Sequence, residues 1–319
     1  MSTSILKLAP ACKNYIWGGR RLIEDFNINF DGETLAEAWV LAAHKDGASI
    51  ITNGDYAGKN FCEYLGEVGG DVLGENCRNF KDFPILIKFI DAQDNLSIQV
   101  HPSDDYALKV EGQLGKHEMW YILDAAPNSF IYHGLNRTVS KKEFAERIKA
   151  GTLTEILRKV YVKRGDCVFI PAGTIHSVGA GVLLAEIQQN SNVSYRIFDY
   201  GRVDANGKTR QLHIDKAVDV ANLSPIEQDE KKYPHLVTCD YFTVDKINLN
   251  GKFFSRLEGT VTAESFLSIL ILDGQGKISV DEEELSFRRG DSFFIPANSR
   301  KWAITGFVDA LATTVRLGR

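Results

Sequence analysis

The chain has 319 residues, of which 44% are hydrophobic and 25% charged, and its formal net charge is -5. This composition is typical of a folded globular protein and excludes a disordered or fibrous chain. The acidic balance argues against a nucleic-acid binder, which normally carries a clustered basic patch, and no apolar run reaches the ~18 residues of a membrane span.

Short runs rich in β-branched and aromatic residues, separated by turn residues, dominate the chain. The first of these are FPILIKFI (83–90), NLSIQVH (95–101), EMWYILD (118–124), SFIYHG (129–134), CVFIPAG (167–173) and VLLAEIQQ (182–189). The C-terminal part continues with YFTVDKINL (241–249), SFLSILILD (265–273), KISV (277–280), SFFIPAN (292–298) and VDALATTVRL (308–317). This regular spacing predicts a mainly β protein built as a sandwich or barrel, because closing a sheet removes its exposed edges.

Helical signals are fewer and lie between these strands. Ser103 begins a short candidate helix with two acids in its first turn, where the helix dipole favours negative charge. Ser140 and Glu143 form a capping box, and the helix that they start ends at Gly151. We expect a second short helix over 152–160, so that a small α-helical insert interrupts the strands.

One segment of the chain is echoed near its C-terminus. GDCVFIPAGTIH (165–176) resembles GDSFFIPANSRK (290–301) position by position, and the similar strands YILD (121–124) and LILD (270–273) lie upstream of the two copies. The first copy is longer, by roughly the length of the helical insert. Two related β units, one with an α insertion, explain this pattern. Lys301 stands where the first copy has His176, so we expect the chemistry in the first copy only.

The glycine-containing stretch 273–276 is expected to form a turn between two strands. It lacks the three-glycine spacing and the strand-turn-helix context of a dinucleotide-binding fingerprint, so it gives no support to a nucleotide site.

Four polar side chains from three predicted strands could converge inside the first β unit. Gln99 and His101 lie two apart in one strand and project from one face, as do Lys116 and Glu118. His176 follows a Pro-Ala-Gly turn that can direct it inward. Two imidazoles with oxygen ligands suit Zn²⁺, although Mn²⁺, Fe²⁺ or Co²⁺ would also fit. Either histidine alone could equally be a hydrogen-bonded core residue, and Gln99 could instead be a hydrogen-bond partner of a ligand.

The string G-D-x-x-F-I-P-A-G-x-x-H at 165–176 resembles the second motif of the cupin superfamily, whose members are double-stranded β-helix (jelly-roll) barrels. The resemblance implies a mainly β chain of two cupin-like barrels with a small α-helical insertion. An N-terminal catalytic cupin domain would occupy 1–232, with the helical insert at about 138–160. A C-terminal cupin-like domain without metal ligands would occupy 233–319.

Six segments, in order, resemble the type I mannose-6-phosphate isomerases, particularly the short bacterial form. They are KNYIWGGRRL (13–22), AEAWVLAAHKDGAS (36–49), FPILIKFIDAQDNLSIQVHPSDDYA (83–107), GKHEMWYIL (115–123), GDCVFIPAGTIH (165–176) and EIQQNSNVSYRIFDYGR (186–202). The resemblance implies a zinc-dependent aldose-ketose isomerase that interconverts mannose 6-phosphate and fructose 6-phosphate through an enediol, with one Zn²⁺ per chain. The family's pair of cupin barrels with an α-helical insert agrees with the internal echo.

The resemblance also implies residue roles. The family's zinc ligands correspond to Gln99, His101, Glu118 and His176, its active-site arginine to Arg196, and the lysine that precedes its glutamate ligand to Lys116. A lysine and a serine linked to phosphate binding correspond to Lys88 and Ser97.

Isomerisation needs a base to move a proton between C1 and C2, and Lys116 is the first candidate, with Glu186 competing for the role. Arg196 would stabilise charge on an oxygen or fix the substrate, because a guanidinium rarely loses its proton. Lys88 could instead be a strand lysine with a solvated head, and Ser97 a strand-edge hydroxyl. Trp17 could stack on the sugar or seal the barrel mouth.

Two other functions stay open at this point. A different metal-dependent cupin enzyme, either a dioxygenase or an isomerase of another phosphosugar, would use a similar ligand set. A sugar-binding cupin without catalysis would need no proton-transfer group. The expected partner is a small phosphosugar, with neither nucleic acid nor membrane, and the sequence leaves the oligomeric state open.

Five cysteines, an odd number with no CxxC spacing, argue against a disulfide framework and against a thiolate zinc site. The N-terminal sequence lacks the basic start and long apolar stretch of a signal peptide. We therefore expect reduced thiols and a cytoplasmic location.

Overall fold

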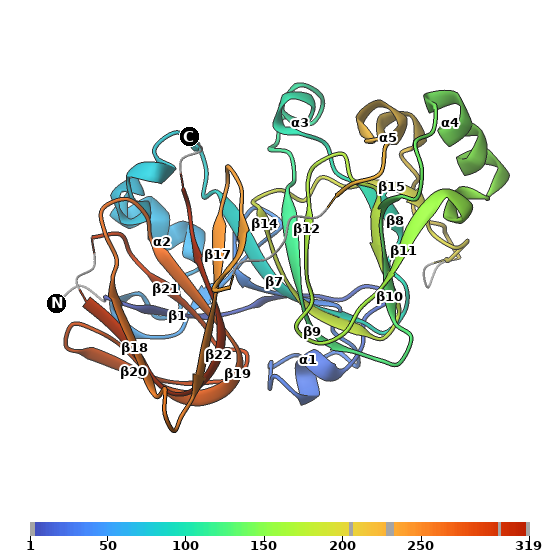
Figure 1. Ribbon diagram of the computed structural model, residues 1–319. Helices are drawn as coiled ribbons and strands as arrows, with labels where there is room; N and C mark the ends of the chain where they lie inside the picture. Colours follow the sequence, from blue (N-terminus) through green and yellow to red (C-terminus); the bar gives the residue numbers. More distant parts are fainter. Residues whose placement is uncertain (1–3, 204–206, 228–232, 299–300, 317–319) are drawn as a thin grey trace.

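The computed structural model describes residues 4–203, 207–227, 233–298 and 301–316. The fold is mainly β, as predicted, and its sheets are antiparallel. Two β regions lie side by side, one formed largely by the C-terminal strands and drawn in orange and red, the other drawn mostly in cyan and green (Figure 1). Among the described residues, no helix is both long and apolar enough to cross a membrane.

The first β region consists of two sheets with an apolar core between them. The six-stranded sheet has the order β12 (Cys167–Ile170), β9 (Glu118–Ala125), β14 (Val182–Gln189), β7 (Ile85–Ala92), β3 (Glu37–Leu41) and β2 (Ala11–Lys13). The five-stranded sheet has the order β11 (Leu157–Tyr161), β10 (Phe130–Leu135), β13 (His176–Val178), β8 (Ile98–Val100) and β15 (Tyr195–Phe198). Side chains from both sheets, among them Trp120, Leu184 and Ile131, form this core.

The central strands β7 and β14 are buried along their whole length, because the six-stranded sheet is covered on both faces. Ile87 and Phe89 of β7 contribute to a core shared with the C-terminal region, whereas Ile90 belongs to the core inside the first region. Lys88 shares a face with Ile90, so the alternation of the strand directs its side chain inward.

The C-terminal region is a nine-stranded sheet that also takes in strands from the beginning of the chain. Its main order is β16 (His235–Thr238), β17 (Thr243–Asn250), β22 (Lys301–Thr314), β19 (Leu267–Val280), β21 (Ser292–Ile295), β1 (Leu6–Ala9) and β6 (Ile50–Ile51). Two further strands pair with members of this order, β18 (Arg256–Thr260) with β22 and β20 (Glu283–Arg288) with β19. The predicted division at 232/233 stays a prediction, and residue 232 lies outside the described part of the chain.

Three helices, α3 (Asp104–Val110), α4 (Lys141–Ala150) and α5 (Ile214–Val220), lie at the same end of the first β region (Figure 1), where α5 packs against β15 and β8. The α4 helix begins and ends as predicted, since the hydroxyl of Ser140 accepts a hydrogen bond from the backbone N–H of Glu143 and Gly151 has φ 70°. The remaining short elements are α1 (Arg21–Glu24), α2 (Phe61–Val68), β4 (Ala43–His44), β5 (Gly47–Ala48) and the 3-10 turns Gly54–Tyr56, Gly70–Leu73, Glu75–Cys77 and Leu153–Ile156.

The prediction of a helix over 152–160 is wrong. The helical insert is therefore shorter than the expected 138–160. Only Leu153–Ile156 forms a single 3-10 turn, and the residues after it form strand β11, which pairs with β10. Val160 and Tyr161 suit a strand, so pairing with a neighbour overrides the weak helical signal.

The turn expected at 273–276 is also wrong, because β19 continues through it. Gly274, with φ 109°, lies beside an irregularity in the pairing with β22. A Cβ at this position would lie 2.1 Å from the carbonyl oxygen of Phe307, so only glycine permits this close approach of the two strands.

Candidate functional site

An inward-facing row of side chains crosses four neighbouring strands of the six-stranded sheet. Glu186 of β14 lies opposite Trp120 of β9 on one side and opposite Lys88 of β7 on the other. Trp39 of β3 lies opposite Lys88. Directly opposed residues share a face of the sheet, so strand register alone brings a carboxylate and an ammonium together between two indoles.

Three of the four predicted metal ligands meet in one buried cluster. The candidate ligand atoms of His101, Glu118 and His176 all lie within 4.8 Å of one another, and the three side chains are buried. The Nε2 atom of His101 is 3.4 Å from Oε2 of Glu118, and Nε2 of His176 is 3.3 Å from its Oε1. Gln99, the fourth, lies directly opposite His176 across the pairing of β8 with β13.

Both imidazoles turn the same nitrogen toward the carboxylate. Nδ1 of His101 lies 3.0 Å from the carbonyl oxygen of Val193, and Nδ1 of His176 lies 2.8 Å from that of Thr174. A carbonyl can only accept, so Nδ1 carries the proton and Nε2 presents a lone pair. Burial, with Lys116 adding to it, lowers the pKa of His101 to about 3, and burial also lowers the pKa of His176. The two rings are therefore neutral near pH 7.

The cluster has the properties of a cation site. Burial alone would raise the pKa of Glu118, but the charge of Lys116 outweighs it and holds that pKa well below its usual range. Apart from the ion pair between Oε2 of Glu118 and Lys116, the carboxylate of Glu118 and Nε2 of His176 have no hydrogen-bond partner in the described part of the chain. A buried carboxylate that faces imidazole lone pairs is stabilised only by positive charge. Two neutral imidazoles, a carboxylate and a nearby amide form a donor set that fits a zinc-like divalent ion.

Lys116 lies between this cluster and Glu186. Its Nζ atom is 2.8 Å from Oε2 of Glu118, 3.3 Å from Nε2 of His101 and 3.7 Å from Oε1 of Glu186. The other oxygen of Glu186 accepts a hydrogen bond of 2.7 Å from the indole of Trp120. The two groups that the sequence offers as proton carriers are therefore neighbours at one end of the metal-ligand cluster.

Lys88 is held by two carboxylates. Its Nζ atom lies 3.1 Å from Oε1 of Glu186 and 3.3 Å from Oε2 of Glu37, and the side chain is buried. Burial would lower the pKa of Lys88, but Glu186 and Glu37 outweigh it and raise that pKa. The alternative of a strand lysine with a solvated head is therefore wrong.

A cavity of about 230 Å³ opens beside the cluster. Its lining includes every predicted site residue outside the His101–Glu118–His176 cluster, namely Trp17, Lys88, Ser97, Gln99, Lys116, Glu186 and Arg196. Other lining residues were not predicted as site residues, and they include Tyr15, Glu37, Trp120, Asn192, Ser194 and Arg210. The cluster of His101, Glu118 and His176 does not itself line the cavity. Lys116 and Gln99 connect the cluster to the cavity.

Two guanidinium groups lie on the wall formed near β15. Arg196 lies opposite Gln99, and its Nη1 donates to the carbonyl oxygen of Gln211 at 2.9 Å. Burial, and then the charge of Arg210, lowers the pKa of Arg196. Arg210 is oriented by a 2.8 Å hydrogen bond from its Nε to Asp199. No motif surrounds Arg210 in the sequence, so only the fold brings it to the cavity.

The backbone that carries Lys116 is fixed at three successive positions. The N–H groups of 115–117 donate to Oδ1 of Asp104 at 2.7 Å, to the carbonyl oxygen of Pro102 at 3.0 Å and to Oε1 of Gln189 at 2.8 Å. The hydroxyl of Tyr241, from the C-terminal region, donates to the other oxygen of Asp104 at 2.8 Å. The two β regions therefore meet directly behind the site.

Two known protein families match parts of the chain. "Phosphomannose isomerase type I, catalytic domain" matches residues 5–128, and "Mannose-6-phosphate isomerase, cupin domain" matches residues 232–315.

Known proteins resemble the chain over nearly its whole length. Mannose-6-phosphate isomerase ManA of Bacillus subtilis (strain 168) is 35% identical over 326 residues, which cover 98% of this chain and 99% of that protein. A crystal structure of the mannose 6-phosphate isomerase from Bacillus subtilis has a TM-score of 0.89 at 34% identity and covers 98% of this chain and 99% of its own.

A structure described as mannose 6-phosphate isomerase, holo and zinc bound, has a TM-score of 0.77, covers 99% of this chain and 100% of its own, and is 19% identical, which shows a shared fold. The extent and level of identity to the Bacillus subtilis protein decide the family. The chain belongs to the type I mannose-6-phosphate isomerases.

Proposed function

We propose that the chain interconverts mannose 6-phosphate and fructose 6-phosphate by moving a proton between C1 and C2 through an enediol. The observation that carries this proposal is the buried His101–Glu118–His176 cluster, with Lys116 and Glu186 beside it at the end of a cavity. Membership of the family supports the same reaction.

We assign one divalent ion per chain, Zn²⁺, to His101, Glu118 and His176, with Gln99 as the fourth ligand. Oε1 of Glu118 and Nε2 of His176, which have no hydrogen-bond partner among the described residues, support the assignment, as does the zinc-bound protein of the same fold. When bound, such an ion acts as a Lewis acid and stabilises negative charge on the substrate oxygens at C1 and C2.

Proton transfer is assigned to Lys116, with Glu186 as the alternative. Both line the cavity, and their charged atoms are 3.7 Å apart, so a proton at C1 or C2 would lie within reach of either group. Arg196, which keeps its charge, is placed to hydrogen-bond an oxygen on which negative charge grows.

The phosphate group is assigned to Lys88, Ser97 and Arg210, which line the same cavity. Binding of the remote phosphate aligns C1 and C2 with the reacting groups. Because Lys88 is already shared by Glu186 and Glu37, we assign it the further role of orienting Glu186. Trp17, buried and stacked on Tyr15 with ring centroids 5.5 Å apart, closes the side of the cavity.

The finer fold assignment is part of the same proposal. Two cupin-like barrels, a catalytic one within 1–232 and a second one within 233–319, agree with the match of the C-terminal part to a cupin domain. A phosphosugar is the expected partner. The cytoplasmic location stays a prediction.

A coupled assay with mannose 6-phosphate, before and after chelation, tests the proposal. We expect turnover that chelation abolishes and added Zn²⁺ restores. Oxygen consumption without fructose 6-phosphate would favour a dioxygenase, and binding of the sugar phosphate without turnover would favour a non-catalytic sugar-binding protein. Full activity of the metal-free chain would overturn the metal assignment alone.

A further inference from the structure

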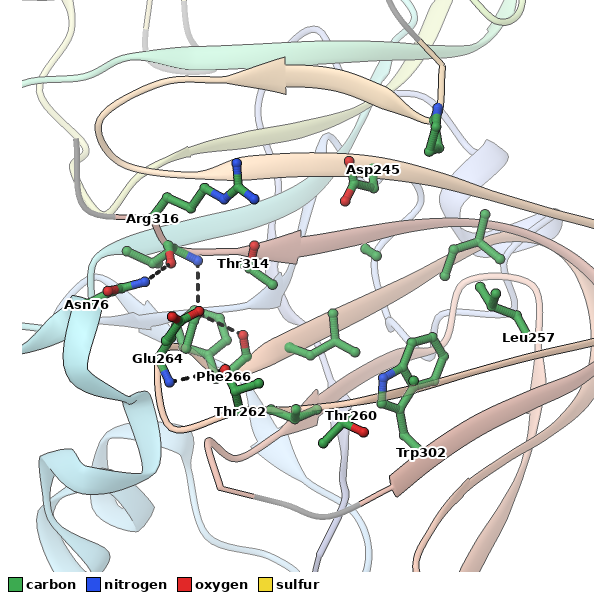
Figure 2. Close-up of a pocket in the computed structure, with 18 of the residues that line it drawn as sticks. Asn76, Asp245, Leu257, Thr260, Thr262, Glu264, Phe266, Trp302, Thr314 and Arg316 are labelled. Atoms are coloured by element: carbon green, nitrogen blue, oxygen red, sulfur yellow. Dashed lines mark hydrogen bonds between the residues drawn. The ribbon is translucent and has the colours of Figure 1, made fainter. Parts of the chain in front are cut away.

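A second cavity, of about 440 Å³, lies in the C-terminal β region between β17, β18, β19 and β22 (Figure 2). Its position follows from the internal echo. In the first region Glu118 of β9 lies opposite Ile170 of β12, and in the second Leu267 of β19 lies opposite Ile295 of β21. These are the positions that the echoed segments align, so the two regions pair these strands in the same register. Leu267 lines the second cavity, at the place that Glu118 occupies beside the first.

The second cavity lies at the corresponding place in the C-terminal region, but it lacks the ion-binding side chains of the first region. Along the echo, Leu267 replaces Glu118 and Ser265 replaces Lys116. The hydroxyl of Ser265 is fully engaged, since it donates to the carbonyl oxygen of Phe266 at 2.8 Å and accepts from the N–H of Val315 at 2.9 Å. A ligand of this cavity would therefore bind without a resident metal.

One wall of the second cavity is an indole that packs closely beside a glycine. Trp302 of β22 is paired with Gly259 of β18, and a Cβ at Gly259 would lie 2.8 Å from the indole Nε1. Because Gly259 has no side chain, the indole ring of Trp302 has room to lie along strand β18. Leu257 and Ile247 continue this apolar wall, so the cavity offers a flat aromatic surface flanked by aliphatic groups.

The opposite side of the cavity is polar and carries hydrogen-bonding groups. Figure 2 shows Glu264 and Thr314 on the side away from Trp302, with Asp245 and Arg316 nearby. The carboxylate of Glu264 and the hydroxyl of Thr314 have no hydrogen-bond partner among the described residues, so both are available to a ligand. Carboxylates accept hydrogen bonds from hydroxyl groups, and a threonine both donates and accepts.

The charges of the lining distinguish this cavity from the first one. Asp245 of the lining pairs with His235 and Lys246 pairs with Asp309, which leaves one carboxylate, Glu264, and one guanidinium, Arg316, to meet a ligand. The first cavity, in contrast, has two arginines and two lysines in its lining. With one unpaired carboxylate and one unpaired guanidinium, the second cavity has no excess positive charge to hold a phosphate group, so it favours an uncharged ligand rich in hydroxyls.

We propose that this second cavity binds a neutral, unphosphorylated hexose unit. A pyranose ring has an apolar C–H face that packs on an indole, and hydroxyl groups around its edge that bond to carboxylates and threonines. The inference rests on the C-terminal region alone and does not depend on the proposed isomerase reaction.

The test is a calorimetric titration of the full chain with the methyl glycosides of mannose, glucose and galactose. A methyl glycoside cannot open to an aldehyde, so the isomerase reaction cannot consume it. We expect at least one glycoside to bind, and to bind equally well when mannose 6-phosphate saturates the first cavity. Trp302→Ala should weaken this binding at least tenfold and Glu264→Gln severalfold, whereas Phe253→Ala, which removes an aromatic ring that is 88% exposed and outside the cavity, should leave it unchanged.

Three results would overturn the proposal: no binding of any of the three glycosides, binding that mannose 6-phosphate abolishes, or binding that Trp302→Ala leaves intact. Trp302→Phe keeps an aromatic surface and should retain most of the affinity, which separates loss of stacking from loss of folding. Isomerase activity of the Trp302 variants, measured in parallel, should equal that of the unaltered chain.

Discussion

Lys116 is the residue at which the metal-ligand cluster and the substrate cavity meet. It contacts Glu118 on one side, approaches Glu186 on the other and lines the cavity. Its place could be predicted from its spacing to Glu118, because residues two apart in an extended segment share a face. Its hydrogen-bonding surroundings could not be predicted, since they come from strands distant in sequence.

Lys116→Met keeps the length of the side chain and removes the proton carrier. We expect kcat to fall by about 10²–10⁴-fold with bound zinc retained, because general acid–base groups contribute at this level. Steady-state kinetics with metal analysis on the same sample checks this. Lys109→Met, on the exposed side of α3, is the matched control. An unchanged kcat in the Lys116 variant would move the role to Glu186.

His133 makes the stability of the fold sensitive to acid. Its Nε2 lies 3.1 Å from the carbonyl oxygen of Phe169 and its Nδ1 lies 2.7 Å from the guanidinium of Arg158, so the neutral ring satisfies both contacts. Burial, with Arg158 adding to it, lowers the pKa of His133 from 6.5 to about 4. The stabilisation is complete above pH 6.5 and is lost as pH falls from 6.5 through about 4, because the unfolded chain takes up the proton first.

This loss amounts to about 3 kcal/mol at most. His133→Gln offers one donor and one acceptor without titrating, so its unfolding free energy should fall less steeply than that of the unaltered chain over this pH range. Urea unfolding at several pH values measures the difference. Parallel curves for the two proteins would contradict the assignment.

The loop before β9 is held by hydrogen bonds from other parts of the fold, and it thereby positions Lys116 in the site. Asp104, at the start of α3, accepts from the backbone N–H of Gly115 and from the hydroxyl of Tyr241. The sequence predicts that Asp104 and Asp105 begin a helix, and this is confirmed. It does not predict that the first of them also fixes the segment that carries Lys116.

Asp104→Ala should lower both stability and turnover. The substitution leaves the Gly115 N–H and the Tyr241 hydroxyl without their acceptor, at a cost of about 1–3 kcal/mol for each buried group. We expect a lower melting temperature and a reduced kcat, measured by thermal unfolding and the coupled assay. Asp105→Ala, one residue along and exposed, is the control and should change neither. Equal effects of the two substitutions would contradict a positioning role for Asp104.

The strands were easier to predict from the sequence than the segments that connect them. Every apolar run named as a strand overlaps a strand of the structure, because burial demands those side chains, although the runs 265–273 and 277–280 belong to the single strand β19. The errors at 152–160 and 273–276 occur where pairing with a distant strand decides the conformation. Arg210 was missed for a similar reason, since only the folded chain brings it beside Arg196.

The whole molecule is tied together by one core that spans both β regions. Phe294 of β21 packs against Phe61 of α2 at 4.9 Å between ring centroids and against Phe266 at 5.1 Å. Strands β1 and β6 add main-chain pairing between the two ends of the chain. The echo in sequence predicts two related β units, but it carries no sign that the first strand of the chain pairs with the C-terminal sheet.

Phe294→Ala should therefore destabilise both regions together. The ring is fully buried, and removing it should cost about 3–5 kcal/mol. We expect unfolding followed by tryptophan fluorescence and by loss of isomerase activity to shift to the same lower denaturant concentration. Phe253→Ala, at an exposed position, should shift neither. Two separate transitions would contradict a shared core.

We propose that one divalent ion, which the reaction requires, is held by His101, Glu118, His176 and Gln99. Anomalous diffraction at the zinc absorption edge, on crystals of the active protein, tests it most directly. We expect a single strong peak about 2.0–2.2 Å from Nε2 of both histidines and from a carboxylate oxygen of Glu118. A peak elsewhere in the molecule, or fully active crystals without a peak among these residues, would contradict it.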